Sequence, residues 1–138
     1  MNKLLLKVIL SIGLTISVFS SCLVNAQTNP SQRVFELRTY TSHENRLGDV
    51  VARFKNHTTR LFERHGITNI GYWIPTDQPN TLVYIVAHPS REQAKKNWEA
   101  FQKDPEWIAA REASMTNGPI VVKVQSVFME PTEFSPIK

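Results

Sequence analysis

The sequence predicts an α+β fold of the ferredoxin-like type, with elements in the order β-α-β-β-α-β. Three observations lead to this prediction. Residues 34–40 alternate apolar and polar side chains, two amphipathic helical stretches follow at 41–65 and 90–103, and a proline-rich turn at 75–80 joins two strand patterns. Right-handed connections then give a four-stranded antiparallel sheet with both helices on one face and the first and third strands central.

The first strand, Val34–Tyr40, has the period of two that marks a half-buried strand. One of its faces is mostly apolar, and we expect that face to lie against the helices. It carries Phe35, Leu37 and Thr39. The opposite face carries a carboxylate, a guanidinium and a phenol in a row, from Glu36, Arg38 and Tyr40.

A long helix is expected next, from a capping box of Thr41 and Glu44 to about His65, with Gly66 as its C-terminal stop. His57 and Thr58 fill the middle of its inward apolar stripe, so His57 is expected to face the sheet. The other members of the stripe are Leu47, Val50, Val51, Phe54, Leu61 and Phe62.

The second half of the chain has clear local signals. Strands are expected at 67–74 and 81–88, joined as a hairpin, and at 120–129. Ser90 should cap a helix that ends near Lys103, and Asp104 should cap a short helix that has Pro105 in its first position.

The N-terminus has the pattern of a signal peptide. Residues 1–26 combine two lysines, an apolar stretch too short for a stable membrane span, and a small-residue ending at Ala26. We therefore expect a protein exported to the periplasm or secreted, with a flexible leader at 27–32, one domain at 33–130 and a tail at 131–138. The alternative is a lipoprotein anchored through Cys22, which follows a loose lipobox.

The composition of the chain limits the kinds of partner and cofactor that we expect. The chain has 16 basic and 12 acidic residues. Loss of Lys3 and Lys7 with the signal peptide leaves 14 basic residues against 12 acidic ones, a formal charge of +2. The basic residues are scattered, so nucleic acid is not an expected partner. The histidines lack metal-ligand spacing, and the mature domain would have no thiol, so no metal and no cofactor are expected.

The sheet face opposite the helices stays uncovered in a monomer. Both sets of alternate residues in the strand at 81–88 are largely apolar, so a large apolar surface is exposed whichever set lies there. Such surfaces mark protein interaction sites. We therefore expect a homodimer with the two sheets facing each other.

The chain resembles the NIPSNAP family, small domains of the dimeric α+β barrel class. The resemblance covers about residues 33–130, except that the hairpin turn differs from the glycine-rich turn frequent in the family. It is carried by these motifs in order: Phe35–Tyr40 (FELRTY), Phe54–His57, His65-Gly66, Gly71–Trp73 and Asp104–Trp107 (DPEW). The resemblance implies the fold and the dimer, and it leaves the activity undefined.

Three residues are the candidate catalytic groups. A buried neutral His57 can act as a general base or as a ligand, or it can be a hydrogen-bonded core histidine. Arg38 can bind a substrate carboxylate, with Tyr40 donating a hydrogen bond, or it can form a salt bridge with Glu36. Because Arg38 and His57 are expected on opposite faces, they can share a pocket only at an end of the sheet.

Tyr72 and Trp73 are the candidate ligand-binding residues, since aromatic rings can line a pocket; the alternative is a role as core or interface anchors. The expected function is small-molecule binding in a pocket beside the sheet. One alternative is a cofactor-free oxygenase or isomerase acting on a small organic substrate, by analogy of fold. Others are a non-catalytic dimeric interaction module and a haem protein with His57 or His88 as axial ligand.

Overall fold

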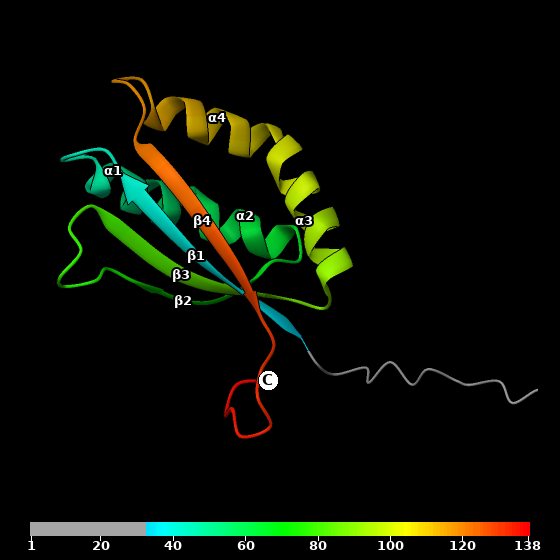
Figure 1. Cartoon of the computed structure of the whole chain (residues 1–138). Coiled ribbons are helices and arrows are strands. Elements are labelled where there is room, and N and C mark those ends of the chain that lie inside the picture. Colours follow the sequence, from blue (N-terminus) through cyan, green and yellow to red (C-terminus); the bar gives the residue numbers. More distant parts are fainter. Residues whose placement is uncertain (1–32) are drawn as a thin grey trace, which may run out of the picture.

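The computed structural model describes residues 33–138, so the expected signal peptide (1–26) and leader (27–32) lie outside the described residues. The predicted β-α-β-β-α-β order is confirmed, with a further short helix before the last strand (Figure 1). The elements are β1 (Val34–Ser42), α1 (Leu47–Arg53), the π-helical turn η1 (Phe54–Thr58), α2 (Thr59–Arg64), β2 (Thr68–Trp73), β3 (Thr81–His88), α3 (Arg91–Lys103), α4 (Pro105–Ser114) and β4 (Val121–Met129).

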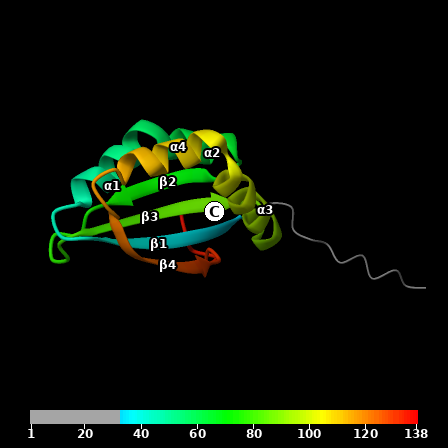
Figure 2. The ribbon, with the colours of Figure 1, turned by 90° about the horizontal axis from the view of Figure 1, so that it is seen from above.

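The four strands form one antiparallel sheet in the order β2-β3-β1-β4, so β1 and β3 are central as predicted. All the helices cover the same face of this sheet (Figure 2). Arg38 is paired with Tyr84 of β3 on one side and with Ser126 of β4 on the other. These three residues therefore form a row across the middle of the sheet.

The assignment of faces in β1 is the reverse of the prediction. The Tyr40 ring packs 5.5 Å from that of Phe54, and the indole of Trp98 in α3 donates to Glu36, so the polar row faces the helices. The apolar row lies on the opposite face, which we call the open face. The residues that register places there include Leu37, Thr39, Val83, Ile85 and Val127.

The π-helical turn explains why the predicted orientation of His57 is wrong. Phe62 is 12 positions after Val50, which is about three and a third turns of a regular helix and would leave Phe62 off the inward face. In η1 the Thr59 amide donates to the Phe54 carbonyl, five residues back, and this wider turn absorbs the difference. Thr58 therefore faces inward, 1 % exposed, and His57 is turned to a half-buried outer position.

The hydrophobic core lies between the helices and the sheet. Phe62 and Tyr84 are its largest fully buried apolar residues, and Phe54 packs against both. The other members of the buried cluster are Val50, Leu61, Ile67, Leu82, Val86, Phe101 and Ile120. Alternation in β3 thus places Leu82, Tyr84 and Val86 inside.

Two of the three predicted helix caps are present in the structure. Ser90 accepts a hydrogen bond from the Gln93 amide, and Asp104 accepts from the amides of Glu106 and Trp107, so both predicted caps are confirmed. The capping box predicted at Thr41 is wrong. β1 continues through Ser42 because it is paired on both sides, and α1 begins only at Leu47, without a side-chain cap.

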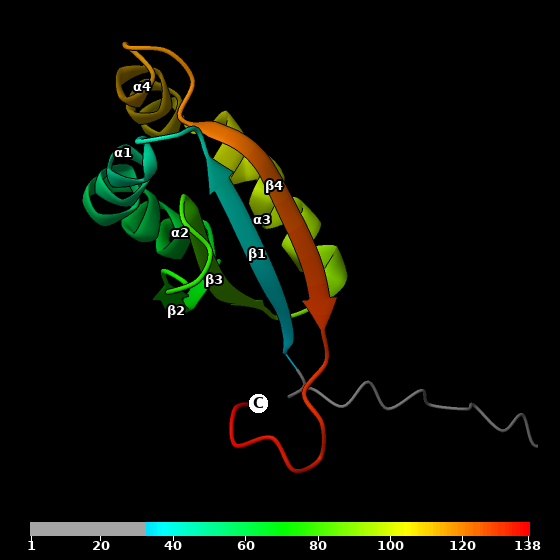
Figure 3. The same ribbon diagram turned by 60° about the vertical axis from the view of Figure 1, so that its left-hand side comes forward.

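The C-terminal tail turns back below the sheet (Figure 3). Arg33 donates from Nε to the carbonyl oxygen of Lys138 at 2.9 Å. Ser135 and Ile137 line a small cavity together with Phe35 and Ile85 at one end of the open face. Within residues 33–138, no helix has the length and apolar character needed to cross a membrane.

Candidate functional site

A buried carboxylate, Glu36, is the centre of a polar cluster between the sheet and α3. Glu36 is 1 % exposed, and its two oxygens lie within hydrogen-bonding distance of four side chains. The donor distances to its oxygens are 2.7 Å from Arg38 Nη1, 2.5 Å from Ser126 Oγ and 2.7 Å from Trp98 Nε1, and His88 Nε2 lies at 3.3 Å. A buried charge with this many partners is satisfied.

These contacts keep Glu36 ionised. Burial by itself raises the pKa of a carboxyl group, but here the hydrogen bonds from His88 and Ser126, the charge of Arg38 and the bond from Trp98 together outweigh it. The pKa of Glu36 is lowered to about 2. Glu36 is therefore an anchor for Arg38 and a poor general base, because an effective base has a pKa near the working pH.

Arg38 is held between this carboxylate and the aromatic ring of Trp98. Its guanidinium carbon lies 4.4 Å from the centre of the Trp98 ring, and Nη1 forms the salt bridge with Glu36. Nε of Arg38 is buried without a hydrogen-bond partner among the described residues. The side chain is thus fixed in position and keeps unused donor capacity.

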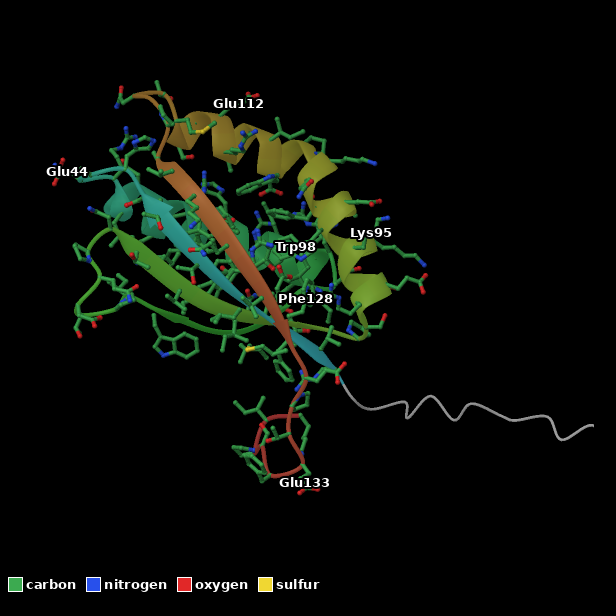
Figure 4. All side chains as sticks on the ribbon, viewed as in Figure 1. Glu44, Lys95, Trp98, Glu112, Phe128 and Glu133 are labelled. Carbon is green, nitrogen blue, oxygen red and sulfur yellow. The ribbon has the colours of Figure 1, made fainter. Side chains whose placement is uncertain are left out.

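Arg38 and Trp98 line a cavity of about 440 Å³ between α3 and β4, which we call the α3–β4 cleft. In Figure 4, Trp98 and Phe128 lie in the space between these two elements. The other lining residues are Arg91, Lys95, Glu99 and Gln102, all from α3. The cleft opens at β4 because this edge strand has no strand beyond it.

The α3–β4 cleft is electropositive. Arg38 is paired with Glu36, and the other two cations of the lining, Arg91 and Lys95, face a single lining carboxylate, from Glu99. Arg91 lies 3.9 Å from the centre of the Phe128 ring, so a second guanidinium is stacked on an aromatic face. Stacked guanidinium groups keep their N–H edges available, and these edges match carboxylate and phosphate oxygens. The cleft can bind an anionic group beside two aromatic faces.

The predicted catalytic residues fall in different places. Arg38 and Tyr40 lie on the same face of β1, with the guanidinium 6.0 Å from the Tyr40 ring centre. Tyr40 is half-buried against the core, beside Phe54 and Tyr84. His57 lines a separate cavity between η1 and α4, so it does not share a site with Arg38.

The predicted ligand-binding residues also separate. Tyr72 stacks on Tyr84 with ring centres 5.2 Å apart and donates to Asn69 Oδ1, which makes it a core residue. Burial raises the pKa of Tyr72 well above its ordinary value. Trp73 pairs with Val83 and is 51 % exposed, on the open face.

Two further expectations concern metals and haem. No three His, Cys, Asp or Glu side chains gather into a metal site within the described part of the chain. His88 is completely buried with Nε2 directed to Glu36, so that nitrogen already has a partner.

Several cleft residues were missed in the sequence. Arg91, Lys95 and Phe128 line the cleft and Ser126 binds Glu36 beside it, but none of them is a site candidate from the sequence. The i, i+4 spacing of Arg91 and Lys95, with Trp98 three residues further on, was the available signal. It places two cations and an indole on one side of α3.

A four-stranded antiparallel sheet with its helices on one face and elements in the order β-α-β-β-α-β defines a ferredoxin-like α+β protein. The NIPSNAP family model matches residues 35–136. The chain therefore belongs to the NIPSNAP family, and the resemblance inferred from the motifs is confirmed. None of the curated proteins compared with the chain matched it.

Solved structures share this fold. A NIPSNAP family protein of unknown function from Agrobacterium tumefaciens is 20 % identical, with a TM-score of 0.67 over 77 % of this chain and 94 % of that one. An uncharacterised NIPSNAP-like protein from Burkholderia xenovorans is 21 % identical, with a TM-score of 0.67 over 75 % and 89 %. A cofactor-independent oxygenase from Streptomyces nogalater is 13 % identical, with a TM-score of 0.55 over 77 % and 99 %.

Proposed function

We propose that this protein binds a small organic anion in the α3–β4 cleft. The observation that carries the proposal is the pair of guanidinium groups, Arg38 and Arg91, each stacked on an aromatic ring of the cleft. The volume of about 440 Å³ lies within the range of small-molecule sites. A carboxylate on an aromatic or apolar body would match both the charges and the rings.

Binding has more support than catalysis. A cofactor-independent oxygenase shares the fold, as the Streptomyces structure shows for that protein. In this chain, however, Glu36, which holds Arg38 at the cleft, has a pKa of about 2 and accepts hydrogen bonds at both oxygens, and His57 lines a different cavity. The cleft therefore offers positioned cations, and neither Glu36 nor His57 is placed to take a proton from a ligand bound there.

The test compares benzoate with benzamide, which have the same ring and differ in charge. Titrations followed by calorimetry should show that benzoate binds at least tenfold more tightly, a difference of about 1.4 kcal/mol. Lys95→Gln and Arg91→Gln should weaken benzoate binding. Lys96→Gln is the matched control, because Lys96 is the next residue on α3 and pairs with Glu92 outside the cleft. Equal binding of the two ligands, or unchanged binding in Arg91→Gln, would contradict the proposal.

We also propose that the protein is a homodimer that buries the open face. Leu37, Val83 and Ile85 form an apolar centre on that face, and Trp73 and Val127 are more than half exposed at its edges. Burial of apolar surface stabilises association by roughly 25 cal/mol per Å² before its entropic costs. The dimer would leave the α3–β4 cleft accessible on each protomer, because the cleft is on the helix side.

Export is the remaining part of the proposal. Its support is the pattern of residues 1–26, and the mature chain would begin at Gln27. Mass spectrometry of protein recovered from the periplasm or medium tests it. A diacylglyceryl-modified Cys22 would instead identify a lipoprotein.

A further inference from the structure

Arg53, at the C-terminal end of α1, is a buried cation without a counter-ion. It is 6 % exposed, and no carboxylate among residues 33–138 lies within ion-pairing distance of it. Its Nη1 donates to Ser114 Oγ at 3.2 Å, and its guanidinium lies 5.1 Å from the Trp107 ring centre. Its Nε has no hydrogen-bond partner in the part of the chain that the structure describes.

The positive charge of Arg53 is not balanced by the groups around it. A buried charge is tolerated when an opposite charge lies beside it and its N–H groups are hydrogen-bonded. The Ser114 hydroxyl and the Trp107 ring carry no negative charge, and they leave Nε of Arg53 without an acceptor. Burial lowers the pKa of Arg53, and the nearby charge of Arg111 lowers it further. Arg38 offers the contrast within the same fold, because there a carboxylate from Glu36 supplies the opposite charge.

Arg53 lines a cavity of about 550 Å³ between α1, η1 and α4, which we call the α1–α4 cavity. Small side chains, Ala52, Ala110 and Ala113, keep the space between the helices open. Besides Arg53, the polar residues that line it are Arg46, Asp49, Asn56, His57, Ser114, Thr116 and Asn117. The π-helical turn contributes two of these, and such turns occur frequently at functional sites.

The charges of the α1–α4 cavity favour an anion. Its one carboxylate, Asp49, is occupied by Nε of Arg46, whose Nη1 donates to the Asn117 carbonyl at 2.8 Å. Arg53 is therefore the cation of the cavity that lacks an acidic partner. Asn56 and His57 add side chains that can donate hydrogen bonds to an oxyanion.

We propose that the α1–α4 cavity is a second anion-binding site, in which a carboxylate or phosphate group supplies the counter-ion that Arg53 lacks. The planar guanidinium presents Nε and a terminal nitrogen along one edge, which matches two oxygens of such a group. The site shares no lining residue with the α3–β4 cleft, so it does not depend on the function proposed for that cleft.

Calorimetric titration of the purified protein with inorganic phosphate, and separately with acetate, tests the site in a buffer without other oxyanions. We expect saturable binding of at least one of the two, weakened at least tenfold in Arg53→Met. Lys55→Gln is the matched control, since Lys55 is an exposed cation two residues along the same helix and does not line the cavity. It should bind as the wild type does.

A purely structural role for Arg53 gives different results. Arg53→Met would then melt at a lower temperature but bind phosphate and acetate as the wild type does, or the wild type would bind neither ion. Either outcome overturns the proposal. If Arg53→Met does not fold, Arg53→Lys replaces it: lysine keeps the charge and loses the planar edge, so binding should weaken at least threefold, and unchanged affinity would refute the site.

Discussion

Replacement of Glu36 by glutamine should destabilise the protein strongly although the change in shape is small. A glutamine has one acceptor oxygen and an NH2 group that can only donate. Glu36 accepts at both oxygens, from Arg38 and Ser126 at one and from Trp98 at the other. The substitution therefore leaves at least one donor facing another donor and leaves Arg38 without its counter-charge.

Two independent estimates give the size of the effect. Breaking a buried ion pair by removing one partner costs about 3 to 5 kcal/mol. The fall of the Glu36 pKa from 4.5 to about 2 corresponds to about 3 kcal/mol of preference for the ionised form. Because the Arg38 side chain is 18 % exposed, water can replace part of the lost interaction, and we expect a loss of about 3 kcal/mol.

The assay is urea denaturation of Glu36→Gln and of Glu92→Gln. Glu92 is an exposed glutamate paired with Lys96, and its replacement should have no measurable effect. The pKa of Glu36 is lower in the folded protein than in the unfolded chain. The stabilisation by ionised Glu36 is therefore present above pH 4.5 and is lost as the pH falls toward 2. Wild-type stability should therefore decline over that range more steeply than that of Glu36→Gln. If the two variants prove equally stable at neutral pH, the cluster does not hold the fold as argued.

Three further predictions follow from other parts of the structure. Asp104→Ala removes the cap of α4 and the partner of His65 Nε2 at 2.7 Å, so the variant should have a lower thermal melting temperature than the wild type. The difference in melting temperature should shrink as the pH drops from 3.8 toward 2, because the wild-type carboxylate becomes protonated over that range. Val83→Asp places a charge on the open face and should convert a dimer into monomers in sedimentation, whereas a wild type that sediments as a monomer at micromolar concentration would contradict the proposed dimer. Gly71→Ala would bring a new Cβ within 2.5 Å of the exposed Trp73 indole, so tryptophan fluorescence should shift with little change in stability, and an unchanged spectrum would disprove that contact.

The local signals in the sequence predicted the fold well. The predicted strand at 81–88 coincides with β3, and the caps at Ser90 and Asp104 depend on residues two or three positions away, which a sequence shows directly. The position of the central strands followed from general rules of connection handedness.

The candidate site was only partly predictable, because its geometry depends on distant contacts. Arg38 was identified, but the face it occupies is decided by Trp98, 62 residues from Glu36, and by Ser126, 90 residues from it. Judged by hydrophobicity alone, the row of Phe35 and Leu37 was the better candidate for the core. His57 was misplaced for a different reason, since the expected orientation assumed a regular helix throughout and took no account of the π-helical turn at Phe54–Thr58.

The Glu36 cluster also bears on how β1 finds its partners during folding. Both rows of this strand contain large apolar or aromatic residues, so hydrophobicity distinguishes weakly between correct pairing and a shift by one position. Such a shift would carry Glu36 to the open face and away from His88, Ser126 and Trp98 at once, while directing Phe35 into their polar environment. The buried carboxylate thus favours the observed register of the central strand. It makes the register shifted by one residue unfavourable, although the apolar side chains alone would permit it.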